Sequence, residues 1–528
     1  MRPEVSVLIA AIGKLVLTVI VSVPGGLLLN RVLLYYRLRW TWAVMGLPIA
    51  LLALPFNGFW AVGVTGIAVF AAAVGARWHL DELDSGMDIA ERAQDRLTIS
   101  TVARRSLQRR RVQRDGWVSS SRLIVGEDSH GLPVSIPVGY QSGSHTLVLG
   151  ATGSGKTVSE TWIAARLIDQ GHGAIVIDPK GDRLLRDELR EAAARAQRPF
   201  LEWTPEGPSA YNPYAHGGAS EIADKALAGE TFTEPHYLRQ AQRYLGHAIR
   251  ALHATKQTVS PRLLMQTMDT SRLDELAREL PDDQAEPVHQ YLDSLSDRQK
   301  RDLTGIRDRL SILAESDIGH LLEPTTEHPA IDLQEAVTQR SVVYFRLDAD
   351  RHALLSQMLA AAIISDLITL VATLQGRPSP TVVVIDEFAA VAAQHVVRLF
   401  GRARSAGISL VLGTQELADL TSAGDGLREQ VLGNVAAVVA HRQSVPESAE
   451  LIAGIASTKA VWVTTQQTEE HLLGSQRARR GTRRRGYEYE LHPRHIKMLH
   501  TGQAAVIAPG SDCRPAVTRM YHPKKARS

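Results

Sequence analysis

The chain has 528 residues, which is too many for one hydrophobic core, so we expect roughly two to four domains. The formal net charge is only +3, but Lys and Arg are dense at 104–114 and 477–485, which hints at an anionic partner. The single cysteine, Cys513, excludes an intramolecular disulfide and a cysteine zinc site, and the 19 histidines show no metal-ligand spacing.

Two apolar regions stand near the start of the sequence. Residues 5–29 are long enough to cross a bilayer, and a signal peptide is the alternative, although the run is too long for one. Residues 42–76 are too long for one span and could form a helical hairpin. The arginines at 30–41 favour three spans, since two spans would place them outside. We predict a multi-pass protein of the inner or plasma membrane, with two or three spans and its nucleotide domain in the cytoplasm.

The segment Ala103–Arg114 is strongly basic and follows soon after the last apolar stretch. Its default interpretation is a juxtamembrane patch attracted to anionic lipid head groups. Direct contact with DNA is the alternative.

The octapeptide GATGSGKT at Gly150–Thr157 fits the P-loop pattern G-x-x-x-x-G-K-[ST] at every fixed position. Residues 145–149 predict a strand before it and 158–167 predict a helix after it, which is the context of a phosphate site. Lys156 can reach the β- and γ-phosphates, and the Thr157 hydroxyl can ligate Mg²⁺. This predicts a site for ATP rather than a chance glycine-rich turn. The expected nucleotide-binding residues are Gly150, Ala151, Thr152, Gly153, Ser154, Gly155, Lys156 and Thr157.

Further strand-like runs alternate with helical segments, which predicts a mostly parallel α/β sheet covered on both faces. The run at 173–178 ends in a polar turn, where Asp178 and Lys180 could contact the nucleotide or a neighbouring subunit, or could only stabilise the turn.

The run at 381–385 ends in Asp386 and Glu387, which is the Walker B pattern. Asp386 would hold Mg²⁺ through water, and Glu387 would position and polarise the attacking water. An ordinary strand that ends in two acids is the alternative.

Three polar residues surround the next predicted strand, at 407–415. Gln415 at its end could sense the γ-phosphate. Arg402 or Arg404, at the end of a predicted helix at 389–406, could act across a subunit boundary as an arginine finger. A solvated charge at the end of that helix is the alternative.

Between 216 and 335 the strand-like runs vanish and helical periodicity takes over, which predicts an inserted all-α lobe. By elimination we expect this lobe to recognise a partner. The predicted helices are 221–227, 237–254, 261–268, 272–280, 286–294 and 297–313.

An arginine-rich segment lies at 476–485, and because glycine and threonine interrupt it we predict a flexible loop. Such a loop suits phosphate backbones without reading a base sequence, although a solvated loop without DNA contact is the alternative. The expected DNA-binding residues are Arg477, Arg479, Arg480, Arg483, Arg484 and Arg485.

The motifs GATGSGKT, VIDPKGD, VVVIDEF and LVLGTQELADL, with the late YEYELHPRHIKMLHTGQAAVIAP, together resemble the type IV coupling proteins. These are membrane-anchored, RecA-like motor ATPases of conjugation and type IV secretion. By position, Lys156 and Thr157 match the Walker A pair and Asp386 and Glu387 the Walker B pair. Arg404 matches the arginine ahead of the next core strand, and Gln415 matches the glutamine of the third motif.

The resemblance implies a RecA-like motor that forms a homo-hexamer when active, with an all-α domain that helps select the substrate. It implies a DNA strand with its attached relaxase as substrate, relaxosome proteins and secretion-channel components as partners, and ATP with Mg²⁺ as cofactors. Family members usually have two spans around a small outer domain, whereas the hairpin predicted at 42–76 would leave only a short outer loop. The expected division is 1–78 transmembrane, 79–123 juxtamembrane, 124–215 first motor part, 216–335 all-α domain, 336–515 second motor part and 516–528 basic tail.

Three hypotheses follow, and they differ in what the ATPase serves. The first is a motor that moves DNA, in which ATPase activity depends on single-stranded DNA and on oligomerisation. The second is a receptor for secreted proteins, in which the helical lobe binds the protein to be secreted and the rate of ATP hydrolysis does not depend on DNA. The third is a chromosome translocase, but the short region after 415 leaves little room for the DNA-reading module that it would need.

Overall fold

The computed structural model describes residues 116–523, apart from 120, 130, 140–141, 229–233, 375, 392, 472–473 and 509–513, and only isolated positions before residue 116. Apart from those positions, the predicted membrane spans and the basic segment Ala103–Arg114 lie outside the described residues. The chain forms two compact units, of which the first comprises Met1–Gly116, Gly126–Val134 and Val517–Arg519. The residues predicted to form the site all belong to the second unit.

A largely parallel sheet forms the centre of the second unit, with strand order β10-β4-β9-β8-β5-β7-β6. Strands β4, β5, β8, β9 and β10 are buried along their whole length, which explains why their sequences are continuous apolar runs. The predicted α/β class with a mostly parallel sheet is therefore confirmed. The bounds are β4 Thr146–Leu149, β5 Gly173–Asp178, β6 Phe200–Trp203, β7 Val342–Arg346, β8 Thr381–Ile385, β9 Ile408–Thr414 and β10 Ala437–Ala440.

Further strands continue the sheet beyond β10. Strand β13 (Gln503–Ile507) pairs antiparallel with β10, and β14, β2 and β1 follow in that order, while β3 pairs with β2. These outer strands are β1 Val118–Ser119, β2 Arg122–Asp128, β3 Pro133–Pro137 and β14 Ala516–Met520.

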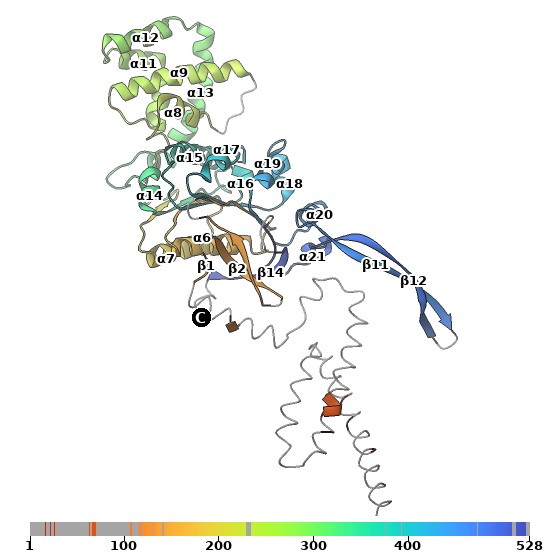
Figure 1. Ribbon diagram of the computed structural model, residues 1–528. Helices are drawn as coiled ribbons and strands as arrows, with labels where there is room; N and C mark the ends of the chain where they lie inside the picture. Colours follow the sequence, from red (N-terminus) through yellow and green to blue (C-terminus); the bar gives the residue numbers. More distant parts are fainter. Residues whose placement is uncertain are drawn as a thin grey trace, which may run out of the picture. The chain divides into compact units, whose positions relative to one another are not determined.

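Helices cover both faces of the sheet, with α6 and α7 on one face and α15 and α17 on the other (Figure 1). Among the described residues, α15 is the one helix long and apolar enough to cross a membrane, yet most of it is buried and it packs on α8, α14 and α17. The helices packed on or beside this sheet are α6 Lys156–Asp169, α7 Arg183–Arg195, α14 Leu333–Gln339, α15 Ala353–Thr373, α16 Phe388–Val391, α17 Ala393–Ala403, α18 Leu417–Ala423, α19 Leu427–Asn434, α20 Pro446–Ile455 and α21 Pro493–Lys497.

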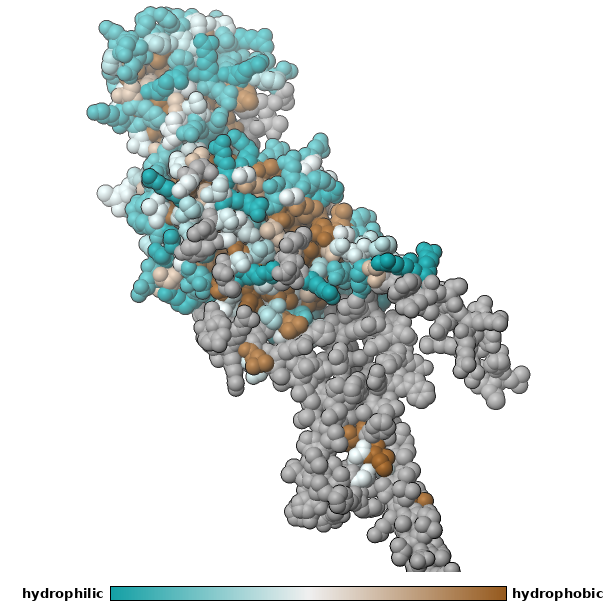
Figure 2. Space-filling view, viewed as in Figure 1, coloured by the Kyte–Doolittle hydropathy of each residue, from teal (hydrophilic) through white to brown (hydrophobic). Residues whose placement is uncertain are grey.

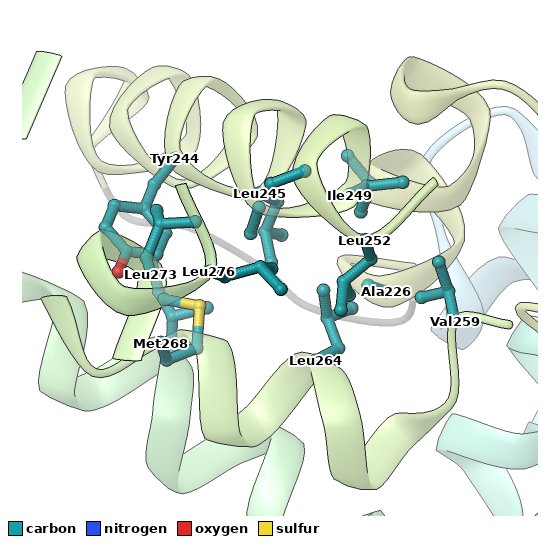
Figure 3. Packing of buried hydrophobic residues seen from close by; sticks show 14 of the residues in the cluster. Ala226, Tyr244, Leu245, Ile249, Leu252, Val259, Leu264, Met268, Leu273 and Leu276 are labelled. Atoms are coloured by element: carbon teal, nitrogen blue, oxygen red, sulfur yellow. The ribbon is translucent and has the colours of Figure 1, made fainter. Parts of the chain in front are cut away.

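The segment between β6 and β7 holds a helical lobe with its own core (Figures 1 and 3). Along α9, Tyr244, Leu245, Ile249 and Leu252 recur at helical spacing and are fully buried, which is what an amphipathic helix requires. Side-chain caps begin three of the helices, at Ser260, Asp269 and Ser296. The helices of the lobe are α8 Ala219–Ala226, α9 Pro235–Ala254, α10 Pro261–Thr267, α11 Thr270–Ala277, α12 Asp282–Asp293 and α13 Asp297–Ala314, with a 3₁₀ turn at Gly319–Leu322.

A buried ion pair joins the lobe to helix α15. Lys225 on α8 donates to Asp366 on α15 with Nζ and Oδ1 2.6 Å apart, and their side chains are 1% and 10% exposed. The Tyr211 hydroxyl donates to the other oxygen of Asp366 at 2.8 Å. The carboxylate therefore satisfies a buried ammonium group and a buried hydroxyl at once.

We expect Asp366→Ala to lower the free energy of unfolding by about 3–5 kcal/mol, because Lys225 would stay buried as an unpaired charge. Denaturant unfolding of the purified protein measures the loss. The double variant Lys225→Met/Asp366→Leu removes both charges and should recover most of the stability. If the double variant is as unstable as the single one, the ion pair is not the source of the effect.

The prediction of a loop at 476–485 is wrong. Residues Gly474–Tyr489 form strand β12, which pairs antiparallel with β11 (Thr458–His471) in a long two-stranded ribbon (Figure 1). Residues with high strand propensity in β11, such as Val461, Val463 and Thr464, supply a partner strand directly before β12 in the sequence, and this hairpin pairing overrides the local signal of Gly481 and Thr482. The register shifts between Gln466 and Thr468, which marks a bulge opposite the arginine-rich stretch.

Candidate active site

The P-loop joins β4 to α6 in a conformation that needs glycine. Gly153 and Gly155 have φ angles of 76° and 109°, which residues with a side chain rarely adopt. Helix α6 begins at Lys156 directly after Gly155, so its first N–H groups point at the turn. The loop between α21 and β13 supports the turn from outside, since the Gly502 N–H donates to the Ser154 carbonyl at 3.2 Å. This arrangement is the anion-binding geometry that the motif predicts.

Strand register brings Lys156, Glu387 and Gln415 to the same edge of the sheet. Strand β9 lies between β4 and β8, with Leu149 beside Thr414 and Ile385 beside Leu412. Gln415 at the end of β9 therefore lies between the P-loop and the Walker B residues. Because all these strands are parallel, their carboxyl ends meet at one edge, which is where open α/β sheets bind ligands.

Lys156 forms ion pairs with both Walker B carboxylates. Its Nζ contacts Asp386 Oδ1 and lies 2.9 Å from Glu387 Oε1. The three residues are 7%, 3% and 8% exposed, so the charges interact in a water-poor environment. Burial lowers the pKa of Lys156, but the surrounding carboxylates raise it further, so the ammonium group stays charged.

Glu387 Oε1 accepts hydrogen bonds from three side chains. The donors are Lys156 at 2.9 Å, Lys180 at 2.8 Å and Gln415 at 3.3 Å. Burial raises the pKa of Glu387, but Lys156 and Lys180 more than offset this and hold it below its usual value. Glu387 is therefore ionised at neutral pH, as a residue that polarises water must be.

Glu387 also has an unusual backbone. Its φ is 47°, in the left-handed region that residues with a side chain rarely occupy. Such a conformation costs about 1–3 kcal/mol and persists where surrounding contacts hold it, as the three donors do here. Strain of this kind clusters at active sites.

Asp178 stabilises the turn that presents Lys180. Its two carboxylate oxygens accept from the N–H groups of Lys180, Gly181 and Asp182, at 2.9, 2.8 and 2.7 Å. Oδ2 also accepts from the Tyr344 hydroxyl at 2.7 Å. The sequence analysis gave Asp178 and Lys180 the same alternatives, and the structure distinguishes them. Asp178 stabilises the turn, whereas Lys180 contacts Glu387.

A fourth carboxyl group, Glu160, was missed by the sequence analysis. It lies one turn after Lys156 on α6, is fully buried, and neither of its oxygens has a hydrogen-bond partner among the described residues. Burial raises its pKa well above the usual value, and the nearby Asp386 raises it further. Gly413 permits this approach, because a Cβ there would lie 2.0 Å from Glu160 Oε1 and 2.8 Å from Asp386 Oδ1.

His441 supports the P-loop from the neighbouring strand, and the sequence analysis missed it too. Its Nδ1 lies 3.0 Å from the Gln503 carbonyl, which can only accept, so Nδ1 carries the proton and Nε2 accepts from Ser159 Oγ at 2.9 Å. A Cβ at Gly155 would lie 3.5 Å from the imidazole. A polar residue directly after the buried strand β10 was the available signal, the same signal that pointed to Asp178 and Gln415.

Stability should fall as the pH drops through the range where His441 is neutral only in the folded state. Burial lowers the pKa of His441 to about 4 from the ordinary 6.5, so the unfolded chain binds more protons between these values. The contribution of neutral His441 to the free energy of unfolding is complete above pH ~6.5, and about 2 kcal/mol of this contribution is lost between pH 7 and pH 5. Denaturant unfolding at the two pH values measures the change.

The variant His441→Gln should show a smaller loss of stability between the two pH values. The matched control is His253→Gln, at an exposed histidine on α9, and it should leave the pH dependence unchanged. Equal pH dependence in His441→Gln and the unsubstituted protein would contradict the assignment of the neutral histidine.

The structure does not bring the arginine-finger candidates to this site within one chain. Arg402 and Arg404 are exposed and precede β9, at the end of the sheet opposite to Gln415. The Arg404 carbonyl accepts from the Gly143 N–H, ahead of β4. A role for either arginine at the nucleotide therefore requires a second subunit.

The predicted DNA-binding arginines lie together on β12. This strand belongs to the separate two-stranded sheet, whereas the residues that converge on Glu387 lie at the edge of the large sheet. Arg484 and Arg485 are exposed. The side chains of Arg477, Arg479, Arg480 and Arg483 lie outside the described residues.

The residues present fit a magnesium nucleotide. The glycine turn, the start of α6 and Lys156 form a cradle for phosphate, and Thr157 and Asp386 supply the oxygen ligands that Mg²⁺ prefers. The described part of the chain contains no group of three or more His, Cys, Asp or Glu side chains able to hold a metal ion.

Comparison with known proteins gives a family match over most of the chain. The model for the type IV secretion-system coupling protein DNA-binding domain matches residues 131–510. No curated protein matches the chain.

Several solved structures share the fold. The bacterial conjugative coupling protein TrwB in an unbound form is 16% identical, with a TM-score of 0.57 over 79% of this chain and 91% of that one. TrwB in complex with ADP and Mg²⁺ is 18% identical, with a TM-score of 0.53 over 72% and 85%. VirB4 of Thermoanaerobacter pseudethanolicus is 14% identical, with a TM-score of 0.51 over 78% and 99%. The predicted RecA-like fold is therefore confirmed.

Proposed function

Because the chain belongs to the family of type IV secretion-system coupling proteins, we propose that it is a membrane-anchored ATPase that recruits a relaxase-bound DNA strand and moves it in conjugative transfer. The observation that carries the catalytic part is the convergence of Lys156, Lys180 and Gln415 on one oxygen of Glu387, at the end of the P-loop sheet. The solved TrwB complex with ADP and Mg²⁺ supports the same pair of cofactors here.

The roles of the residues follow from their contacts. When bound, Mg²⁺ would neutralise charge on the phosphates. Lys156 would exchange one of its carboxylate partners for phosphate oxygens, and Thr157 and Asp386 would hold the metal. Glu387, ionised and oriented by Lys180, accepts a hydrogen bond from the attacking water. Gln415 bonds to that carboxylate and lies beside the P-loop, so it can report the state of the γ-phosphate to the rest of the sheet.

The remaining parts of the proposal concern the assembly. We propose a homo-hexamer in which Arg404, rather than Arg402, completes the site of the neighbouring subunit, anchored in the inner membrane by the apolar N-terminal region. The arginines of β12 contact DNA phosphates without reading bases. The relaxase, relaxosome proteins, secretion-channel components and membrane lipid are the proposed partners.

The test is ATP hydrolysis by the full-length protein with and without single-stranded and double-stranded DNA, at several salt concentrations. A motor should hydrolyse ATP several-fold faster with DNA, and the stimulation should fall steeply as salt rises. Replacing Arg483, Arg484 and Arg485 by Gln should weaken the stimulation and its salt dependence. An unchanged rate with and without DNA would favour the alternative function, an ATP-dependent receptor for secreted proteins.

A further inference from the structure

The helical lobe contains a cavity that the ATPase does not use. It has a volume of about 520 Å³ and lies between α9 and α13, with Tyr291 of α12 in its wall. Arginines dominate its lining: Arg239 and Arg243 come from α9, and Arg298 comes from α13. The face of the lobe seen in Figure 2 is mainly hydrophilic.

The charge in this arginine cavity is not balanced within the described chain. Arg239 and Arg243 are four residues apart on one helix, so two positive charges share a face and repel each other. Neither Arg239 nor Arg298 forms an ion pair with a described residue, although Asp302 lines the same cavity. The three guanidinium groups thus leave donors free for an anion.

Tyr291 orients one of these arginines. The Arg243 guanidinium lies 4.7 Å from the centre of the Tyr291 ring, and the His247 imidazole stacks on that ring at 4.4 Å with an interplanar angle of 9°. Tyr291 is 4% exposed, and its buried hydroxyl has no hydrogen-bond partner among the described residues. The cavity therefore presents three exposed guanidinium groups, one of which is held against the ring of a buried tyrosine.

The chemistry of the lining favours carboxylates over nucleic acid. Single-stranded nucleic acid is normally bound by aromatic faces on which bases stack, together with basic residues. Here the aromatic ring in the wall is already in contact with Arg243 and His247. Planar guanidinium donors bind carboxylates and phosphates alike in a bidentate way, so it is the occupied ring of Tyr291 that favours a carboxylate ligand over nucleic acid.

We propose that the arginine cavity is a docking site for an acidic peptide segment of a protein partner, held through its Asp or Glu side chains by Arg239, Arg243 and Arg298. This function lies outside the ATPase site and depends neither on nucleotide nor on the translocation of DNA.

The test measures the binding of a fluorescein-labelled oligoglutamate peptide to the full-length protein by fluorescence anisotropy at physiological salt. The double variant Arg239→Ala/Arg298→Ala should bind at least about ten-fold more weakly, because each lost charged hydrogen bond is worth about that factor. Both arginines are exposed, so the variant should fold normally, and its ATPase rate should be unchanged.

The matched control is Arg250→Ala/Arg301→Ala, which removes one exposed arginine from each of the same two helices outside the cavity. It should bind the peptide as the unsubstituted protein does. Equal weakening in both double variants would show a general attraction to charge and would overturn the proposal. The same measurement is made with a labelled oligo-dT of the same net charge. If the Arg239→Ala/Arg298→Ala variant loses binding of oligo-dT but not of the peptide, the site binds nucleic acid and the proposal is wrong.

Discussion

Lys156→Ala is expected to lower the rate of ATP hydrolysis by about 10²–10³-fold, the usual cost of removing one preorganised group that stabilises transition-state charge. Its ammonium group lies at the first residue of α6, beside both Walker B carboxylates and at the place where the P-loop would hold the β- and γ-phosphates. Nucleotide binding should weaken as well, since the same ammonium charge attracts the phosphates of bound ATP before the reaction. Steady-state hydrolysis and titration with a fluorescent ATP analogue measure the two effects.

The matched control is Lys180→Ala. Lys180 also forms an ion pair with Glu387, but it is 43% exposed and does not lie in the P-loop, so we expect only a several-fold loss of rate. Lys156→Ala also leaves Glu160, Asp386 and Glu387 buried together without their nearest cation, so its unfolding must be measured in parallel. Activity within about three-fold of the unsubstituted protein would contradict the role assigned to Lys156.

Glu387→Gln should separate binding from hydrolysis. We expect the rate to fall by about 10²–10⁴-fold, the contribution of a positioned general base, while ATP is bound at least as tightly as before. Binding should survive because the substitution keeps the shape of the side chain and removes a negative charge near the phosphates. Single-turnover hydrolysis and nucleotide titration report the two quantities.

Glu450→Gln, at an exposed carboxylate on α20, is the matched control and should leave both quantities unchanged. If Glu387→Gln instead loses ATP binding and hydrolysis in parallel, Glu387 is a binding or structural residue, and the base must be sought elsewhere. Glu160 would then be the next carboxyl group to test, since it is buried beside Asp386.

The sequence by itself determined the class of fold and the centre of the site. A P-loop is a local pattern, because its glycines are required by the φ angles of one short turn, and the structure shows these angles at Gly153 and Gly155. Buried parallel strands are local too, since continuous apolar runs such as Val382–Ile385 mark them. The helices of the lobe were predictable to within a few residues for the same reason, because the apolar residues of α9 and α13 recur at helical spacing within one continuous segment each.

Tertiary structure decided which of these local pieces meet. Gln415 contacts Glu387 only because β9 lies between β4 and β8, and Glu160 lies beside Asp386 only because Gly413 leaves room. The same holds for His441 beneath the P-loop and for the meeting of α9 and α13 around the arginine cavity. Each of these depends on hydrogen bonds or packing between residues far apart in the sequence, and no local propensity specifies which distant partner a strand or a buried side chain will find.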